Sequence, residues 1–321
     1  MSEKYNLISK ESFETILGPI KYNLTNDYMF KATLQECNEA LLGIISALLR
    51  VEASSLEVSV VNPILLGRNV VSKDFFLDVH VIVNHYKHMN LEMQVSDEGN
   101  WLERSVSYTS RLYDSLYAGQ DYKNAIPVHH VGFINFDIYD DTNKFYDTFA
   151  LTNSDSTKIY TNKFLVSVVN LRHIDKATYE DKLYKLDMWA RLITAKTWEN
   201  LKEIAKEDPY MEATARKFYE LAQDFDALEE ARRREEYYAR LRHRETKIAE
   251  QDATIAEQGA TIAEQGATIA EQGATIAEQD ATIAEQDATI AEQDATIAEQ
   301  KAKIAEQDAE IARLKAQLNI Q

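Results

Sequence analysis

Cysteine is nearly absent from this 321-residue chain, and the absence limits its chemistry. The single cysteine, Cys37, cannot form an intramolecular disulfide, which fits a protein of the reducing cytoplasm. No CxxC or HxxxH spacing occurs, so the sequence predicts no structural zinc site. The phosphate-binding motifs GxxxxGK and GxGxxG are missing as well.

Long apolar runs are also missing. No run approaches the roughly 20 residues that cross a bilayer, and the polar start MSEKYNLISKESFETIL lacks the apolar segment of a signal peptide. We therefore expect no membrane association. With 45% hydrophobic residues, the composition is globular, and the length allows one or two domains.

Positive charge is outnumbered: 35 Lys and Arg residues stand against 53 Asp and Glu residues, which gives a formal net charge of −18. Residues 245–321 carry −11 of this charge, and the 244 residues before them carry only −7. An acidic total usually argues against nucleic-acid binding. Since most of the acid belongs to a separate segment, DNA binding by the first part of the chain is not excluded.

A seven-residue unit, IAEQ(D/G)AT, repeats almost unchanged from Ile248 onward. A hydrophobic period of seven is that of a coiled coil. The spacing of Ile311, Leu314 and Leu318 places isoleucine at position a and glutamine at position d. We therefore predict that residues 245–321 form a long helix that associates with further copies of the chain.

The predicted seam, the contact between helices through positions a and d, is weak. Each buried isoleucine contributes about 1.5–3 kcal/mol, whereas each buried glutamine needs a hydrogen-bond partner. Gly259, Gly266 and Gly273 each cost roughly 1 kcal/mol of helix propensity relative to alanine. Two interpretations stay open: a self-associating helix, dimeric or trimeric, and a low-complexity tail that is helical only in part.

The first 244 residues mix helical and alternating patterns, which predict an α/β fold. The expected elements, in order, are a helix at 36–50, strands at 56–66, 73–83 and 88–96, a helix at 100–119, strands at 126–139, 145–153 and 162–171, and helices from 179 to about 244. We predict an α/β core at 1–175, a helical extension at 176–244 and a coiled coil at 245–321.

Three polar residues interrupt the expected hairpin LDVHVIVNHYKHMNLEMQV (77–95). Glu92 and Gln94 point to one face of a strand, and a turn centred near His85 places Asp78 across from Glu92. Two carboxylates about 4 Å apart repel by roughly 4 kcal/mol at an effective dielectric near 20, so such a pair binds a cation, shares a proton or moves apart. Oxygen ligands of this kind suit Mg²⁺ or Mn²⁺. Alternatively, both acids are solvated on an open face.

The order of elements and the D…ExQ pair resemble the PD-(D/E)XK nuclease superfamily, and more specifically the PD-(D/E)XK nuclease family transposases, also called Rpn-type recombination-promoting nucleases. The resemblance covers about residues 22–240 and is carried by TNDYMFK (25–31), LLGIISALL (41–49), KDFFLDVHV (73–81), NLEMQV (90–95), ERSVSYTSRLYDSLYAGQDY (103–122), PVHHVGFINF (127–136) and LDMWARLI (186–193). It implies a restriction-endonuclease-like core and DNA cleavage that depends on Mg²⁺ or Mn²⁺.

The resemblance also implies roles for single residues. Asp78 and Glu92 are the expected metal ligands, and Gln94 takes the position of the superfamily lysine, which orients water or stabilises developing charge. Glutamine is usual in this subfamily but cannot supply that charge, so Lys73 and Lys87 are candidates to replace it. Asp27 is expected to approach the metal from the first helix, with a helix N-cap as the alternative.

Other polar residues have two open interpretations each. Arg104, Tyr108 and Arg111 either contact a DNA phosphate or edge their helix. The adjacent His129 and His130 must face opposite sides of a strand, and we predict that they pack there. A basic stretch before the repeat either tracks the DNA backbone or forms a solvated helix face; it comprises Arg232, Arg233, Arg234, Arg240, Arg242 and Arg244.

The leading hypothesis is therefore a Mg²⁺-dependent DNA endonuclease of the cytoplasm, held in two or more copies by the coiled coil. The rival hypothesis is a catalytically silent protein that uses the nuclease fold as a scaffold for oligomerisation or DNA binding.

Overall fold

The computed structural model describes residues 12–61, 64–65, 75–76, 78–114, 121–140 and 143–318. The chain divides into two compact units, Met1–Leu241 and Arg242–Gln321. Among the helices in the described ranges, none combines the length and the apolar character that a membrane crossing requires.

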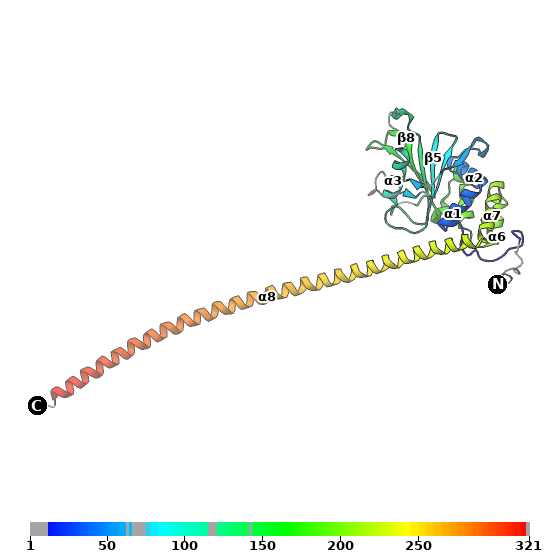
Figure 1. Ribbon diagram of the computed structural model, residues 1–321. Helices are drawn as coiled ribbons and strands as arrows, with labels where there is room; N and C mark the ends of the chain where they lie inside the picture. The colour runs from blue at the N-terminus through cyan, green and yellow to red at the C-terminus, as the bar shows by residue number, and fades with distance from the viewer. Residues whose placement is uncertain are drawn as a thin grey trace. The chain divides into compact units, whose positions relative to one another are not determined.

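A six-stranded mixed sheet forms the centre of the first unit (Figure 1), in the order β1-β4-β5-β6-β8-β7. β1, β4 and β5 pair antiparallel, β5, β6 and β8 run parallel, and β7 is antiparallel to β8. The strands are β1 (Val58–Val60), β4 (Val79–Val83), β5 (Lys87–Gln94), β6 (Val128–Ile134), β7 (Tyr146–Thr152) and β8 (Ile159–Asn170). This mixed sheet confirms the predicted α/β class.

Helices cover both faces of the sheet (Figure 1). α1 (Asp27–Glu36) and α2 (Asn38–Leu49) lie on one face, where the ring centroids of Phe30 and Phe133 are 5.4 Å apart. α3 (Trp101–Tyr113) covers the other face. The later helices are α4 (Tyr179–Leu183), α5 (Leu186–Thr194), α6 (Trp198–Ala205), α7 (Pro209–Ala222) and α8 (Phe225–Leu318), preceded by the 3₁₀ turn η3 (Leu171–Lys176).

The docking of α3 depends on a glycine in the sheet. A Cβ at Gly132 would lie only 1.9 Å from the Trp101 ring, so a side chain at this position is sterically excluded. Trp101 is buried, and its indole therefore sits against the backbone of β6. This close approach fixes the first turn of α3 beside the sheet.

Two predicted strands are divided in the structure. The run 56–66 yields β1 and the short β2 (Ile64–Leu65), and the run 73–83 yields β3 (Phe75–Phe76) and β4. β2 and β3 pair with each other in a separate two-stranded sheet. The end of the first run and the start of the second therefore lie outside the main sheet. α3 ends at Tyr113 rather than at 119, and Gly119 lies outside the described residues.

The repeat segment is helical throughout its described length, because α8 continues without a break to Leu318. This result excludes the interpretation of a tail that is helical only in part. Each repeated threonine from Thr254 to Thr296 donates its hydroxyl hydrogen to the carbonyl of the glutamate four residues earlier. The a-position isoleucines are 47–68% exposed.

Candidate functional site

The β4–β5 hairpin turns at Asn84 and His85, which have φ values of 48° and 61°. Asparagine and histidine are among the non-glycine residues that adopt this left-handed region most readily. The register that follows places Asp78, directly before β4, across from Glu92 in β5, as predicted. The hairpin thus brings one carboxyl group from each strand to the same level of the sheet.

The two faces of β5 have opposite character. Met89, Leu91 and Met93 belong to the apolar core, whereas the alternate residues Glu92 and Gln94 lie on the face that α3 covers. Both polar side chains are nevertheless buried, with Glu92 only 1% exposed. The interpretation of Glu92 as a solvated residue on an open face is therefore wrong.

Asp78 is held by the backbone around it. Its Oδ2 atom accepts a hydrogen bond of 3.0 Å from the Met93 amide, and its carbonyl accepts one of 3.4 Å from Gln35 Nε2 in α1. Burial raises the pKa of the Asp78 carboxyl to about 6, and the negative charge of Asp27 adds to the rise. Asp78 is thus one member of a group of acids that interact electrostatically.

Glu92 lies between a cation and a neutral histidine. Its Oε1 atom is 2.6 Å from the Arg104 guanidinium, and its Oε2 atom is 3.5 Å from His130 Nε2. Burial, followed by the charge of Asp78, raises the pKa of Glu92 to about 8 against the opposing effect of Arg104. Burial also lowers the pKa of His130 to about 3, so this ring is neutral at physiological pH.

Gln94 lies two residues beyond Glu92 on the same face. Its Nε2 atom donates a hydrogen bond of 3.2 Å to the Ser96 carbonyl, while its buried Oε1 atom accepts none from the described residues. Gln94 therefore offers an oxygen but no charge. Lys87, a candidate to supply that charge, is five residues from Glu92 and on the opposite face of β5, and Lys73 lies outside the described residues.

Asp27 is the first residue of α1, and the N-cap of this helix is Asn26, whose side chain accepts from the Met29 amide. The alternative of Asp27 as the N-cap is therefore wrong. Its Oδ1 atom accepts from the Tyr28 amide at 2.8 Å, and its Oδ2 atom accepts from the Tyr238 hydroxyl at 3.3 Å. Burial raises the pKa of Asp27 as well.

The donor set fits a hard divalent cation. In the described structure, both carboxylate oxygens of Glu92 and the Oε1 atom of Gln94 are buried without a hydrogen bond of regular geometry. No cluster of three His, Cys, Asp or Glu side chains arranged for metal binding occurs in these ranges. Asp78 and Glu92 would therefore need backbone carbonyls and water to complete an all-oxygen shell, which Mg²⁺ and Mn²⁺ accept.

Of the α3 residues, Arg104 contacts Glu92 directly. Arg104 also lies over the Tyr108 ring, 5.3 Å from its centroid. Burial opposes the charge of Arg104, but the combined effect of Glu92 and the other nearby acidic groups outweighs it and raises the guanidinium pKa. Burial raises the pKa of Tyr108 to about 12, so its hydroxyl keeps its proton. Arg111, in the last turn of α3, is half-buried.

The two adjacent histidines point to opposite faces of β6, as predicted. His129 pairs with the Ser167 hydroxyl at 2.7 Å, whereas His130 pairs with the Asn90 amide at 3.1 Å and lies beside Glu92. Sequence reasoning missed the proximity of His130 to Glu92. No local pattern signals it, because it depends on the parallel pairing of β5 with β6.

The basic stretch in α8 is largely neutralised in its first turns. Arg232 and Arg233 form ion pairs with glutamates three or four residues away, which favours a solvated helix face for both. Arg234 differs, because its guanidinium is 3.6 Å from Asp27 Oδ2.

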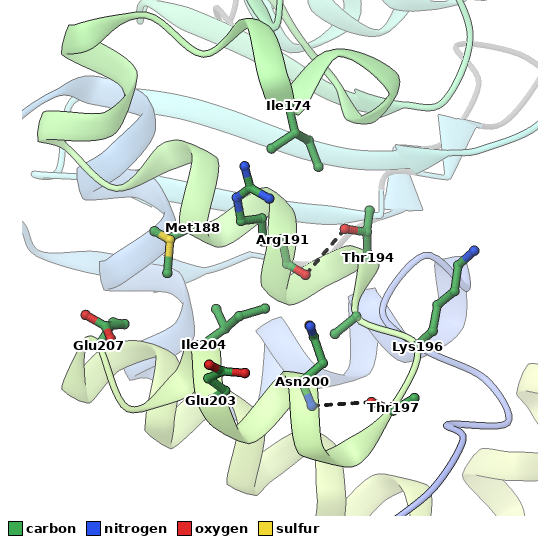
Figure 2. Close-up of a pocket in the computed structure, with 11 residues that line it drawn as sticks. Ile174, Met188, Arg191, Thr194, Lys196, Thr197, Asn200, Glu203, Ile204 and Glu207 are labelled. Atoms are coloured by element: carbon green, nitrogen blue, oxygen red, sulfur yellow. Dashed lines mark hydrogen bonds between the residues drawn. The ribbon is translucent and has the colours of Figure 1, made fainter.

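A hollow of about 560 Å³ lies along η3, α5 and α6 (Figure 2). Arg191, Lys196 and Glu203 are among its lining residues, and the Thr194 hydroxyl donates to the Arg191 carbonyl at 3.3 Å. None of the predicted site residues lines this hollow, so we assign it no part in the reaction.

A family model described as PD-(D/E)XK nuclease family transposase matches residues 24–251, more than two thirds of the chain. The matched range contains Asp27, Asp78, Glu92 and Gln94. Comparisons with the curated proteins and with the solved structures give no match.

Proposed function

Because this chain belongs to the PD-(D/E)XK nuclease family transposases, whose sheet and flanking helices it has, we propose that it is a DNA endonuclease that depends on Mg²⁺ or Mn²⁺. The supporting observation is the pairing of Asp78 and Glu92 across one hairpin, at a site where burial raises the pKa of both acids. The single buried cysteine fits a cytoplasmic location.

In this proposal Asp78 and Glu92 hold the cation, and the oxygen of Gln94 orients the attacking water. The bound ion would polarise the scissile phosphate and lower the pKa of water. The Met93 amide keeps the Asp78 carboxylate in place, and Arg104 keeps the buried Glu92 compensated before the ion binds. Arg104, Tyr108 and Arg111 remain candidates for contact with the DNA backbone.

Self-association through residues 245–321 is part of the same proposal, since it would bring two nicking sites to one duplex. The exposed isoleucine stripe supports it, because such a stripe is stabilised when a partner covers it. The heptad favours parallel chains. In an antiparallel pair the e positions would face one another, and five of them carry aspartate: Asp252, Asp280, Asp287, Asp294 and Asp308.

A silent scaffold is the second candidate. Its supporting observations are the uncharged Gln94 and the ion pair between Glu92 and Arg104, which neutralises the site without a metal. In this case the fold would serve assembly or DNA binding alone.

The test is nicking of supercoiled plasmid in Mg²⁺, with chelator as the blank. Asp78→Ala and the isosteric Asp78→Asn are expected to lose at least about 10²-fold in rate, the scale of one lost transition-state interaction. Asp175→Ala, at an acid that is 70% exposed in η3, is the matched control and should retain the wild-type rate. Equal nicking by wild type and Asp78→Asn would exclude the nuclease and leave the scaffold.

A further inference from the structure

One face of α1 runs alongside the candidate site. Asp27, Lys31 and Gln35 are spaced by four residues, so they form a single stripe on the helix. α1 packs against β4 and β5, and Gln35 Nε2 bonds the Asp78 carbonyl at 3.4 Å. Asp27 and Gln35, four residues before and after Lys31, both interact with Asp78. Lys31 therefore lies on the side of α1 that faces the acids.

Among the described residues near the candidate site, Lys31 is a cation without an ion-pair partner. It forms no hydrogen bond and no ion pair within 4 Å in the described part of the chain. Arg104 is 2.6 Å from Glu92, and Arg234 is 3.6 Å from Asp27. Lys31 is half-buried, and its ammonium is therefore available to an incoming anion.

A purely structural role explains Lys31 poorly. An acid four residues before a lysine is the order that favours an ion pair on a helix. Asp27 instead accepts hydrogen bonds from the Tyr28 amide and the Tyr238 hydroxyl and lies near Arg234, so its oxygens are already engaged. The expected pair with Lys31 is not formed at 4 Å or less.

We propose that Lys31 supplies, from α1, the positive charge that Gln94 cannot supply from β5. The proposal rests on the proposed nuclease function. During hydrolysis the water oxygen forms the new P–O bond and the P–O bond to the leaving oxygen breaks, with protons passing to and from solvent. Lys31 donates a hydrogen bond from its ammonium group to a non-bridging oxygen of the phosphate. Its charge already lowers the pKa of both Asp27 and Asp78, which supports their proximity.

The experiment compares Lys31→Met and Lys31→Arg with wild type in the full-length protein. Lys182→Met, at an exposed lysine of α4, is the matched control. Single-turnover nicking of plasmid in Mg²⁺ measures the rate, and calorimetric titration with Mn²⁺ alone measures cation affinity. Circular dichroism and thermal melting show whether each variant folds like the wild type.

We expect Lys31→Met to lower the nicking rate about 10²–10³-fold, the scale of one lost electrostatic donor. Lys31→Arg should lose less of the rate than Lys31→Met. Lys182→Met should nick at the wild-type rate. Mn²⁺ should bind Lys31→Met as tightly as wild type or several-fold more tightly, since a like charge has been removed.

Two results overturn the assignment of Lys31 while the nuclease stands: nicking by Lys31→Met within threefold of wild type, or weaker Mn²⁺ binding together with a lower melting temperature. Weaker Mn²⁺ binding together with a lower melting temperature would mean that Lys31 has a structural role. If wild type nicks no faster than Asp78→Asn, the proposed function itself fails, and the role of Lys31 fails with it.

Discussion

The two units of this chain break the usual rule of burial in opposite ways. The first unit buries ionisable side chains, with Glu92 1% exposed beneath α3. The second exposes apolar ones, with isoleucines 47–68% exposed along α8. Buried charge is costly unless it is paired, and apolar surface in water gives up the free energy that contact would return. Under the proposed function, a cation would compensate the buried acids of the first unit, and another helix would cover the exposed isoleucines of the second.

The buried acids and the exposed isoleucines differ in what could stabilise them. A divalent ion can neutralise Asp78 and Glu92 within one chain, since the hairpin already aligns them. The isoleucine stripe has no second stripe in its own helix, so under the proposed self-association a second copy of the chain covers it. The comparison leads to three predictions, which begin with the largest expected effect.

The largest effect is expected from charge placed in the seam. Ile276→Asp combined with Ile283→Asp removes four a-position isoleucines from a dimer, about 6–12 kcal/mol of burial. The dissociation constant should rise at least about 10⁴-fold, as measured by analytical ultracentrifugation. Ala277→Asp with Ala284→Asp adds the same charges at position b and should leave the assembly intact. An unchanged assembly in the seam variant would show that the isoleucines are not the contact.

The acid pair predicts an unusual dependence of stability on pH. In the folded protein the pKa of Glu92 is raised to about 8 and that of Asp78 to about 6, so the folded state binds more protons than the unfolded state at intermediate pH. In chelator, the free energy of unfolding should therefore fall as the pH rises from about 4 to 8.

Glu92→Gln, which cannot ionise, should flatten this dependence. At pH 8 in chelator it should be more stable than wild type, by a difference on the order of 2–4 kcal/mol. Urea unfolding at pH 5, 6.5 and 8 measures the difference, and saturating Mg²⁺ should reduce it by stabilising wild type alone. A wild-type protein whose stability rises with pH over this range would contradict the assigned burial of Glu92.

The smallest effect is expected from replacing glycines with alanine. The resulting change in stability should have opposite signs in the two units. A Cβ at Gly259, Gly266 or Gly273 meets no atom within 4 Å. Alanine at each should therefore raise helix stability by about 1 kcal/mol, seen as a higher melting temperature of the helix. Gly132→Ala should instead lower stability by about 1–3 kcal/mol, because the new Cβ would overlap the Trp101 ring. A stabilised Gly132→Ala protein would mean that α3 can shift away from β6.

Local patterns were enough to predict a large part of the molecule. The hairpin register follows from the turn at Asn84 and His85 and from strict alternation, so Asp78 could be placed across from Glu92. The continuous helix of the repeat follows from a seven-residue period. These features depend on neighbours in the chain, and a sequence displays its neighbours directly. Patterns within a few residues also explain why the helices between 179 and 244 were expected.

Only the tertiary structure decided the environment of the acids. Burial of Glu92 beside Arg104 and His130 requires β5 to pair with β6 and α3 to pack against β6 and β8, contacts between segments far apart in sequence. The proximity of Asp27 to α8 likewise joins residues more than 200 positions apart. The raised pKa values come from this burial, because desolvation depends on everything that surrounds a group in space. The sequence by itself thus determined which residues carry the acids and the seam, and tertiary packing determined their charge state and their neighbours.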